Sequence, residues 1–282
     1  MTNVDFRKQR SKLLFFNHLL FLYLMEKRIH IANYALNVLF IGNHQSNSNK
    51  PILVFLHEAL GSIPQWKSFP TKLCQSVELA GMIIERRGHG KSDPLDAPRT
   101  NKYLHNYTYE LKEVLNELLP LNQSFILVGH SDGGTIALLF ATLFPKNLLA
   151  LITMAAHTFV EPETIAGIEP TVQAYEQGKL IGLSRIHGDK TDTLFYAWAN
   201  TWRSIDFISW DIRNEIGNHS IPTRVIQGTM DQFGTIKQVE SITQHLKKAT
   251  ALLIPNCGHH PHLYKETEVI ENITEFIQPL LS

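Results

Sequence analysis

The feature of the sequence that most constrains the fold is an alternation of short apolar runs with helical patterns. The runs are rich in Val, Ile and Leu, do not alternate with polar residues, and lie at 51–56, 82–85, 124–128, 149–154, 224–227 and 251–254. Such runs are typical of strands covered on both faces. Apolar residues at helical spacing follow at 107–119, 135–144, 236–246 and 266–277. The sequence therefore predicts an α/β fold: a mostly parallel central sheet with helices on both faces.

The first residues of the chain, 1–28, are predicted to be an N-terminal extension. Basic residues between positions 7 and 12 precede an apolar run at 13–25, which is the order found in signal peptides. No cleavage site of small residues follows, and the run is too short to span a bilayer. We expect either a docked N-terminal helix or a translation start placed too early, with Met25 as the true first residue. Secretion or peripheral membrane attachment is the alternative.

The rest of the chain is predicted to form a core domain in two parts, 29–155 and 221–282. The first part begins with a hairpin over 29–41 that we expect to turn at residues 34–37. Between the two parts, residues 156–220 contain no strong strand but have helical patterns around 165–177 and 191–202. We predict that this insertion is a helical lid and that Trp198 and Trp202 contact the substrate from it. Buried aromatic residues also serve simply as core, which is the alternative for each tryptophan.

One of the predicted strands runs directly into a glycine-rich polar segment, which reads Gly129-His130-Ser131-Asp132-Gly133. This G-x-S-x-G pattern between a strand and a helix is typical of a sharp turn that projects a nucleophilic serine. We expect Ser131 to have a positive φ, with glycines on both sides so that no Cβ atoms collide. The serine hydroxyl would then lie beside a helix N-terminus, which favours developing negative charge. A glycine-rich turn with a capping serine is the alternative.

A nucleophilic serine needs a histidine base and a carboxylate that orients it. In this architecture the acid and then the base follow the serine along the chain. Asp231 follows one predicted strand in RVIQGTMDQFG, and His259 follows the last strand in ALLIPNCGHHPHLY. Asp132 is a weaker candidate for the acid, because it is adjacent to the serine and is expected to cap the helix or face the pocket. His259, His260 and His262 could form a metal cluster, but no carboxylate ligand is nearby, and we expect no metal.

The negative charge that develops on the substrate oxygen requires two N–H donors. One is expected from the backbone of Asp132, which follows the serine. The other is expected from the loop in ILVFLHEALGS, where the N–H of Ala59 is the first choice and that of Glu58 the second. We also expect the side chains of Glu58, Trp66 and His130 to border the substrate.

Composition excludes several other classes of function. The chain has 282 residues, with 26 Lys and Arg against 26 Asp and Glu, so it has no basic field for nucleic acid. Its two cysteines have neither metal-site nor redox spacing, and a reducing cytoplasm is expected. The segment ERRGHGKSDP lacks the first glycine of a phosphate loop and does not complete G-x-G-x-x-G. We therefore expect a small-molecule substrate, no cofactor and no bound membrane, while the oligomeric state stays open.

Five segments together resemble the α/β-hydrolase fold superfamily, from about residue 29 to the end of the chain. They read LHEALGS, RRGHGKSDP, VGHSDGGTIAL, QGTMDQFG and NCGHHPH, in the order and spacing typical of that superfamily. The resemblance implies that Ser131, Asp231 and His259 are nucleophile, acid and base. It also implies a serine hydrolase that forms an acyl-enzyme and hydrolyses a small, partly apolar ester or related carbonyl compound. Glu58 stands where many members have glycine, which puts the identity of the first oxyanion donor in question.

Comparison with individual branches of the superfamily narrows this expectation. Epoxide hydrolases and haloalkane dehalogenases resemble the chain but have aspartate at the position of Ser131. Carbon–carbon bond hydrolases of vinylogous diketones do use serine, although their oxyanion loops typically read S-G-P-G, which is missing here. Such a hydrolase stays an alternative. So does a ligand-binding member of the fold without catalytic activity, although such a protein would not need all three triad residues.

Overall fold

An eight-stranded sheet runs through the protein in the computed structural model, which describes residues 23–42, 50–217 and 219–281. The strand order is β1-β2-β4-β3-β5-β6-β7-β8. Strands β3 to β8 are parallel to one another, and β2 is antiparallel to both of its neighbours. The predicted α/β fold with a mostly parallel sheet is therefore confirmed. The strands are β1 (Leu24–Ile31), β2 (Tyr34–Ile41), β3 (Ile52–Leu56), β4 (Gly81–Glu85), β5 (Phe125–His130), β6 (Leu148–Met154), β7 (Thr223–Gly228) and β8 (Ala249–Ile254).

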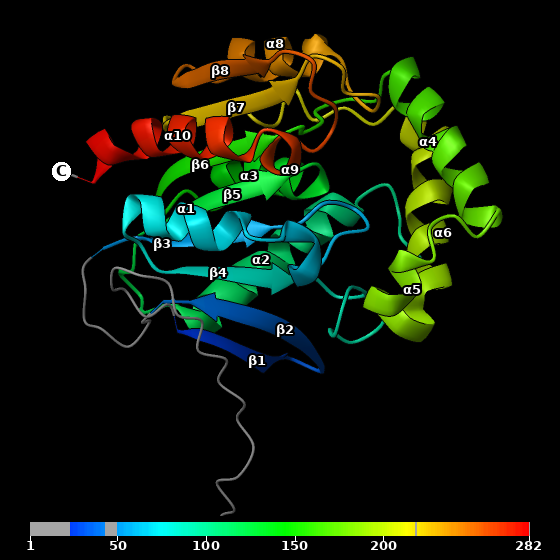
Figure 1. The fold of residues 1–282 in the computed structure, drawn as a ribbon, viewed down its shortest axis with the longest axis horizontal. Coiled ribbons are helices and arrows are strands. Elements are labelled where there is room, and N and C mark those ends of the chain that lie inside the picture. The colour runs from blue at the N-terminus through cyan, green and yellow to red at the C-terminus, as the bar shows by residue number, and fades with distance from the viewer. Residues whose placement is uncertain (1–22, 43–49, 218, 282) are drawn as a thin grey trace, which may run out of the picture.

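Helices cover both faces of the sheet (Figure 1). Helices α1 (Phe69–Val77) and α10 (Glu266–Ile277) lie on one face, and α2 (Tyr103–Leu118), α3 (Asp132–Leu143) and α8 (Ile236–His245) lie on the other. Alternate residues of β3 point to opposite faces, so Leu53 and Phe55 join one hydrophobic cluster while Val54 and Leu56 join the other. All four are essentially inaccessible to solvent. This double burial explains why the strands read as unbroken apolar runs.

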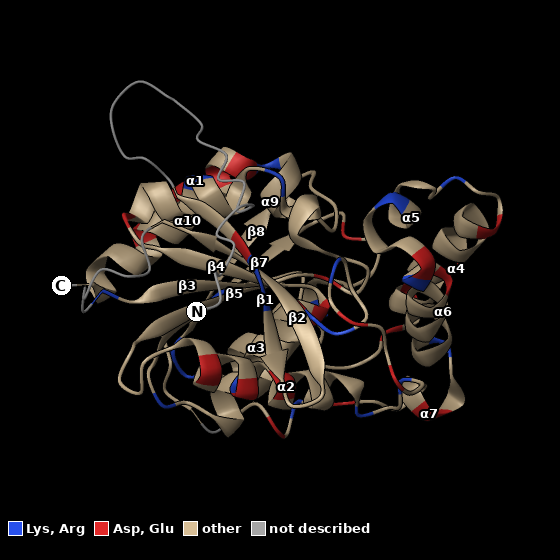
Figure 2. Cartoon of the chain, turned by 90° about the horizontal axis from the view of Figure 1, so that it is seen from below, with Lys and Arg blue, Asp and Glu red and all other residues tan. Residues whose placement is uncertain are grey.

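The chain between β6 and β7 forms a separate group of helices. These are α4 (Pro162–Glu176), α5 (Gly182–His187), α6 (Thr191–Trp202) and α7 (Ile205–Ile208). They stand beyond the carboxyl ends of the parallel strands rather than on either face of the sheet (Figures 1 and 2). The group therefore lies over the edge of the sheet at which the loops after β3, β5, β7 and β8 emerge.

The predicted turn of the N-terminal hairpin is wrong by several residues. Strands β1 and β2 pair from Leu24 with Ile41 to Ile31 with Tyr34, so the turn consists of Ala32 and Asn33. Ala32 has φ 52°, in the left-handed region that such a two-residue connection requires. The predicted turn residue Asn37 lies in the middle of β2, where its amide donates to Glu85 of β4 at 2.8 Å. The polar side chain of Asn37 therefore makes a buried hydrogen bond within the sheet and does not indicate a turn.

Strand β1 forms one border of the sheet and begins earlier than the sequence indicated. Its first residues, from Leu24, fall in the segment predicted as an extension, whose residues 1–22 lie outside the described part of the chain. Glu26, Lys27 and Arg28 are exposed along this border. Glu26 pairs with Lys91 at 2.7 Å, and Arg28 pairs with Asp93. The border strand is thus charged, in contrast to the central strands.

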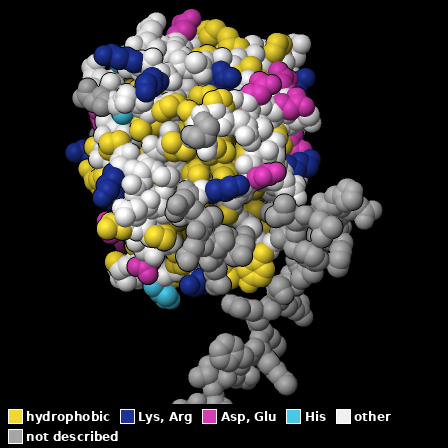
Figure 3. All heavy atoms as spheres, turned by 90° about the vertical axis from the view of Figure 1, so that its left-hand side faces the viewer, with side chains coloured by type: hydrophobic (Ala, Val, Ile, Leu, Met, Phe, Trp, Pro, Cys, Tyr) yellow, Lys and Arg dark blue, Asp and Glu magenta, His cyan; other side chains and the backbone are white. Residues whose placement is uncertain are grey.

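The face of the molecule opposite the α4–α7 group carries hydrophobic side chains near its centre, with charged side chains around them (Figure 3). In the parts of the chain that the structure describes, none of the helices combines the length and apolarity needed to cross a membrane. The two cysteines, Cys74 and Cys257, are both buried and free.

Candidate active site

Ser131 lies on a strained turn between β5 and α3. Its φ of 52° confirms the positive value expected from the sequence. A Cβ atom on Gly129 would lie 2.3 Å from the carbonyl oxygen of Gly133, and one on Gly133 would lie 2.0 Å from the carbonyl oxygen of Leu56. The glycines therefore let the start of α3 approach both its own strand and the end of β3. This contact brings the serine next to the loop that follows β3.

The side chains of Ser131, His259 and Asp231 form a continuous hydrogen-bonded chain from three distant segments. His259 Nδ1 lies 2.8 Å from Asp231 Oδ2, and His259 Nε2 lies 2.9 Å from Ser131 Oγ. A carboxylate can only accept, so Nδ1 carries the proton and donates it to Asp231. Nε2 is then the acceptor, and the hydroxyl of Ser131 donates to it. The imidazole is thereby held in the tautomer that can remove a proton from the serine.

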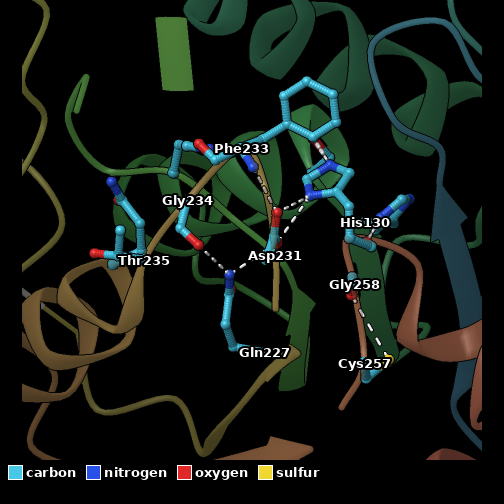
Figure 4. Close-up of polar contacts among 12 residues, drawn as sticks. His130, Gln227, Asp231, Phe233, Gly234, Thr235, Cys257 and Gly258 are labelled. Carbon is cyan, nitrogen blue, oxygen red and sulfur yellow. Dashed lines mark hydrogen bonds and ion pairs between the residues drawn. The ribbon is translucent and has the colours of Figure 1, made fainter. Parts of the chain in front are cut away.

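Asp231 is fixed by donors on several sides (Figure 4). Its Oδ2 accepts from Gln227 Nε2 at 2.8 Å, and its Oδ1 accepts from the backbone N–H of Phe233 at 2.9 Å. The carboxylate is fully buried, which by itself raises the pKa of Asp231. The attraction and hydrogen bond of His259, together with the Phe233 N–H, outweigh this effect, so the pKa lies below its ordinary value of 3.8. Asp231 is therefore ionised at neutral pH.

The loop after β3 has its carbonyl groups bound by side chains of the segment that follows β4. Arg86 donates to the carbonyl oxygens of His57 and Glu58, the latter at 2.8 Å, and His89 Nε2 lies 3.0 Å from the carbonyl oxygen of Ala59. The carbonyls thus point into a buried polar layer. Among the described residues, no acceptor is hydrogen-bonded to the backbone N–H of Ala59 or of Asp132. Two free donors are therefore left where the start of α3 meets this loop.

Glu58, in the same loop, turns its carboxylate back onto the backbone. Its Oε2 accepts from the N–H of Leu60 at 2.7 Å. Burial raises the pKa of Glu58, the neighbouring Asp132 raises it further, and the charges of His259 and Arg86 act in the opposite direction. The electrostatic effect of His259 on this pKa places the carboxyl group of Glu58 near the imidazole.

Two side chains expected to border the substrate lie elsewhere. Trp66, in the short helix η1 (Ile63–Trp66), is turned into the core under α1, where its ring stacks on Phe69 at 5.9 Å. His130 lies behind the base, and its Nε2 donates to the backbone carbonyl of His259 at 2.7 Å. Both expectations are corrected for the same reason: these rings point to the face of the sheet that α1 and α10 cover. His130 instead fixes the backbone that carries His259.

The two tryptophans of α6 reach His259 through intermediate rings that the sequence analysis missed. The Trp198 ring lies 6.5 Å from that of Phe233, which lies 4.8 Å from the imidazole of His259. The Trp202 ring lies 5.2 Å from that of His157, which lies 6.2 Å from the same imidazole. Phe233 lies in the loop after β7, and His157 lies in the loop after β6. Their positions just after strand ends are the feature of the sequence from which they could have been predicted.

Asp132 does not cap helix α3, contrary to one of the two expectations for it. Its carboxylate is buried and accepts from the hydroxyl of Tyr103 at 2.9 Å, and the indole N–H of Trp202 donates to the same hydroxyl at 2.8 Å. A chain of hydrogen bonds therefore connects α6 to the residue that follows Ser131. This arrangement also leaves Asp132 out of contact with the imidazole of His259.

The site is almost covered in this structure. Ser131 is 7% exposed and His259 6% exposed, beneath the α4–α7 group. Two surface cavities border the α4–α7 group, one of about 430 Å³ between α6 and the loop 95–99 and one of about 580 Å³ between α4 and the loop after β7. Asp231 lines the second cavity, while Ser131 and His259 line neither. Within the described residues, no group of three or more His, Cys, Asp or Glu side chains is arranged to hold a metal ion.

Comparison with known proteins identifies the fold. The model of the alpha/beta hydrolase fold family matches residues 51–169. The solved structure of MGS-M2, an alpha/beta hydrolase enzyme from a Medee basin deep-sea metagenome library, superposes with a TM-score of 0.73 at 16% identity, covering 89% of this chain and 97% of that one. The chain has the α/β-hydrolase fold.

Curated proteins with similar sequences include an esterase and a lactonase. A pimeloyl-[acyl-carrier protein] methyl ester esterase of Nitrosomonas europaea is 25% identical over 78% of this α/β-hydrolase and 92% of its own length. The 3-oxoadipate enol-lactonase 1 of Acinetobacter baylyi is 23% identical over 82% of this chain and 90% of its own length. These similarities establish this chain as an α/β-hydrolase enzyme.

Proposed function

We propose that the protein is a serine hydrolase that cleaves a small, partly apolar ester or related carbonyl compound through an acyl-enzyme. The observation that carries the proposal is the hydrogen-bonded chain from Ser131 through His259 to Asp231. In this chain the hydroxyl of Ser131 donates to Nε2 of His259, and Nδ1 of His259 donates to Asp231. Relatives named as an esterase and an enol-lactonase act on acyl–oxygen bonds by their names, which supports an ester or lactone substrate.

The reaction follows from the protonation states of the three groups. As Ser131 Oγ attacks the carbonyl carbon, its proton passes to Nε2 of His259, and Asp231 stabilises the imidazolium that forms. The N–H groups of Ala59 and Asp132 donate to the oxyanion of the tetrahedral intermediate. When the intermediate collapses, His259 returns the proton to the departing alcohol. A water molecule, deprotonated by the same imidazole, then attacks the acyl-enzyme and releases the acid.

The α4–α7 helices act as a lid in this proposal. The low exposure of Ser131 means that a substrate reaches the serine only when these helices shift. The rings of Phe233 and His157 connect the helices, through Trp198 and Trp202, to His259. The apolar part of the substrate would pack against Phe233 and Trp198, and Glu58 would border its polar end.

Labelling with a fluorophosphonate tests the proposal directly. We expect a single phosphonylated residue, Ser131, identified by mass spectrometry of the digested protein, because only a serine activated by a base reacts with this probe. The Ser131→Ala variant should not be labelled, whereas Ser76→Ala, which removes an exposed serine of α1, should be labelled like the wild type. A binding protein without catalytic activity would give no label. A protein that is labelled but cleaves only vinylogous diketones would be a carbon–carbon bond hydrolase.

Replacement of Asp231 by asparagine is expected to lower kcat by about 10,000-fold. The amide of asparagine can donate to Nδ1 and so favours the tautomer in which Nε2 carries the proton and cannot accept from Ser131. The corresponding Asp132→Asn change should lower kcat much less, because Asp132 bonds to Tyr103 and not to the imidazole. Steady-state rates on an activated ester measure both effects. A larger loss for Asp132→Asn would show that the acid has been wrongly assigned.

A further inference from the structure

The loop after β3 has all of its first four carbonyl groups held by buried side chains. Arg86 accounts for the carbonyls of His57 and Glu58, and His89 for that of Ala59, as described above. The fourth, the carbonyl oxygen of Leu60, lies 2.9 Å from Nε2 of His187. His187 is 3% exposed and is the last residue of α5, far along the chain from this loop. The lid thus supplies one of the groups that hold the loop.

The two ring nitrogens of His187 have different partners. A carbonyl oxygen only accepts, so Nε2 carries the proton and donates it to Leu60. Nδ1 accepts from the backbone N–H of Gly90 at 2.9 Å. Burial lowers the pKa of His187, which is consistent with a neutral ring. One imidazole therefore connects the lid to two separate segments, the loop after β3 and the turn around Gly90.

Leu60 is fixed at both of its backbone polar groups. Its N–H donates to Glu58 Oε2 at 2.7 Å, and its C=O accepts from His187. Gly61 packs this loop tightly, since a Cβ atom there would lie 2.8 Å from Cβ of His57. The carbonyl of Leu60 belongs to the Leu60–Gly61 peptide, and one further peptide, Ala59–Leu60, separates it from the peptide that carries the N–H of Ala59. A movement at the Leu60 carbonyl would therefore reach that N–H through the Ala59–Leu60 peptide.

We propose that His187 is a positioning residue: by binding the carbonyl of Leu60 from the lid, it aligns the N–H of Ala59 for the oxyanion, so that the oxyanion site is complete only when α5 is seated. The inference rests on the proposed function, since it concerns the oxyanion of that reaction. It adds to that function a group outside the triad on which the rate of the chemical step depends.

A second contact between the lid and the turn around Gly90 provides a matched control. The ammonium group of Lys190 donates to the carbonyl oxygens of Gly90 at 2.6 Å and of Ser92 at 2.5 Å. Lys190 thus fastens the same part of the lid to the same turn, but it makes no bond to the loop after β3. A variant that only loosens the lid can therefore be separated from one that misaligns the loop.

Two replacements of His187 separate its two bonds. His187→Asn keeps an acceptor near the position of Nδ1, for Gly90, and removes the donor to Leu60. His187→Gln keeps a donor near the position of Nε2 and removes the acceptor. We expect His187→Asn to lower kcat on an oxygen ester by about tenfold to hundredfold, since a misplacement of about 1 Å has effects of this size, with KM little changed. His187→Gln and Lys190→Met should each retain kcat within about threefold of the wild type.

A thionoester of the same acid and alcohol allows a second measurement, the ratio of the rates on the oxygen ester and on the thionoester. A general loss of structure would not change this ratio. Its sulfur is a poor hydrogen-bond acceptor and gains less from the oxyanion donors. His187→Asn should therefore reduce the preference of the enzyme for the oxygen ester over the thionoester, while Lys190→Met should leave that preference unchanged. Wild-type kcat in His187→Asn, an equal loss in Lys190→Met, or an unchanged preference would each overturn the inference.

The same measurements distinguish failure of this inference from failure of the proposed function. Wild-type protein that hydrolyses the ester and is labelled at Ser131, with His187→Asn unaltered, would overturn the role of His187 alone. Wild-type protein that neither hydrolyses the ester nor is labelled would overturn both.

Discussion

Replacement of Ser131 by alanine is expected to lower kcat/KM for an activated ester by about a million-fold. The methyl side chain leaves no hydroxyl to attack the carbonyl, and the imidazole of His259 loses the proton donor that lies 2.9 Å from its Nε2. Residual hydrolysis above the rate in buffer would come from the oxyanion donors and from substrate binding. Initial rates at saturating and limiting substrate measure the loss. A variant with more than about a hundredth of the wild-type rate would contradict the assignment of the nucleophile.

The three side chains should also behave as one unit. His259→Ala alone is expected to reduce the rate about as much as Ser131→Ala, and the double variant should be no slower than either single variant. If the two residues acted independently, the fold-losses in rate of the two single variants would multiply in the double variant. That result would contradict the transfer of a proton from Ser131 to His259.

Acidification from pH 7.5 to pH 5.5 is expected to destabilise the folded protein by several kcal/mol. Burial lowers the pKa of many histidines from the ordinary value of 6.5, and for four that are less than 4% exposed the pKa lies well below that value: His57, His89, His130 and His262. Below pH 6.5 the unfolded chain binds protons on these residues while the folded protein does not. Stability therefore falls as the pH falls from this value toward the lowered values of the folded state.

The size of this effect follows from the number of residues involved. Each such histidine contributes about 1.4 kcal/mol for every pH unit between 6.5 and its lowered pKa in the folded protein. Four of them together give roughly 6 kcal/mol per pH unit, which is comparable with the whole free energy of unfolding of a typical domain, about 5–15 kcal/mol. Buried carboxylates such as Asp231, whose pKa is lowered, lose their contribution only at more acidic pH.

Unfolding in urea at pH 7.5, 6.5 and 5.5 measures this dependence. His262→Phe should reduce the proton uptake on unfolding by about one below pH 6.5, because Nδ1 of His262 has no hydrogen-bond partner among the described residues and its ring packs against Trp66 and Phe69. Replacement of the exposed His30 by glutamine is the control and should still show the fall in stability at low pH, because the buried histidines are unchanged. A free energy of unfolding that stays constant between pH 7.5 and 5.5 would contradict the prediction.

Much of the fold could be predicted because the sheet imposes a strong pattern on the sequence. A strand such as β3, buried on both faces, must be apolar at every position, and it ends where polar residues begin. The parallel arrangement then places all such strand ends at one edge, which allowed Ser131, Asp231 and His259 to be grouped from their positions alone. Helix α1 was missed although Phe69, Leu73 and Val77 have helical spacing, because the segment is short.

The remaining features depend on contacts that no local pattern records. The Trp66 ring points into the core because of how the short helix η1 is oriented. The surrounding sequence would be the same if the ring pointed toward the substrate, so it could not be predicted. Arg86 and His89 belong to the segment RRGHGKSDP, which contributed to the resemblance but gave no role to either side chain. His187 lies in a polar stretch without any motif, and its bond to Leu60 exists only because α5 folds back over the edge of the sheet.

The charged border formed by β1 has a consequence for how copies of the protein meet. The backbone N–H and C=O groups on the outer side of an edge strand can pair with an extended segment of another molecule. Continuous strand pairing of this kind leads to fibrils. On β1, Glu26, Lys27 and Arg28 place charges of both signs along the border, and two of them form ion pairs with Lys91 and Asp93. An apolar strand that paired with β1 would have to remove water from these ion pairs. The charged border thus opposes growth of the sheet by addition of further strands.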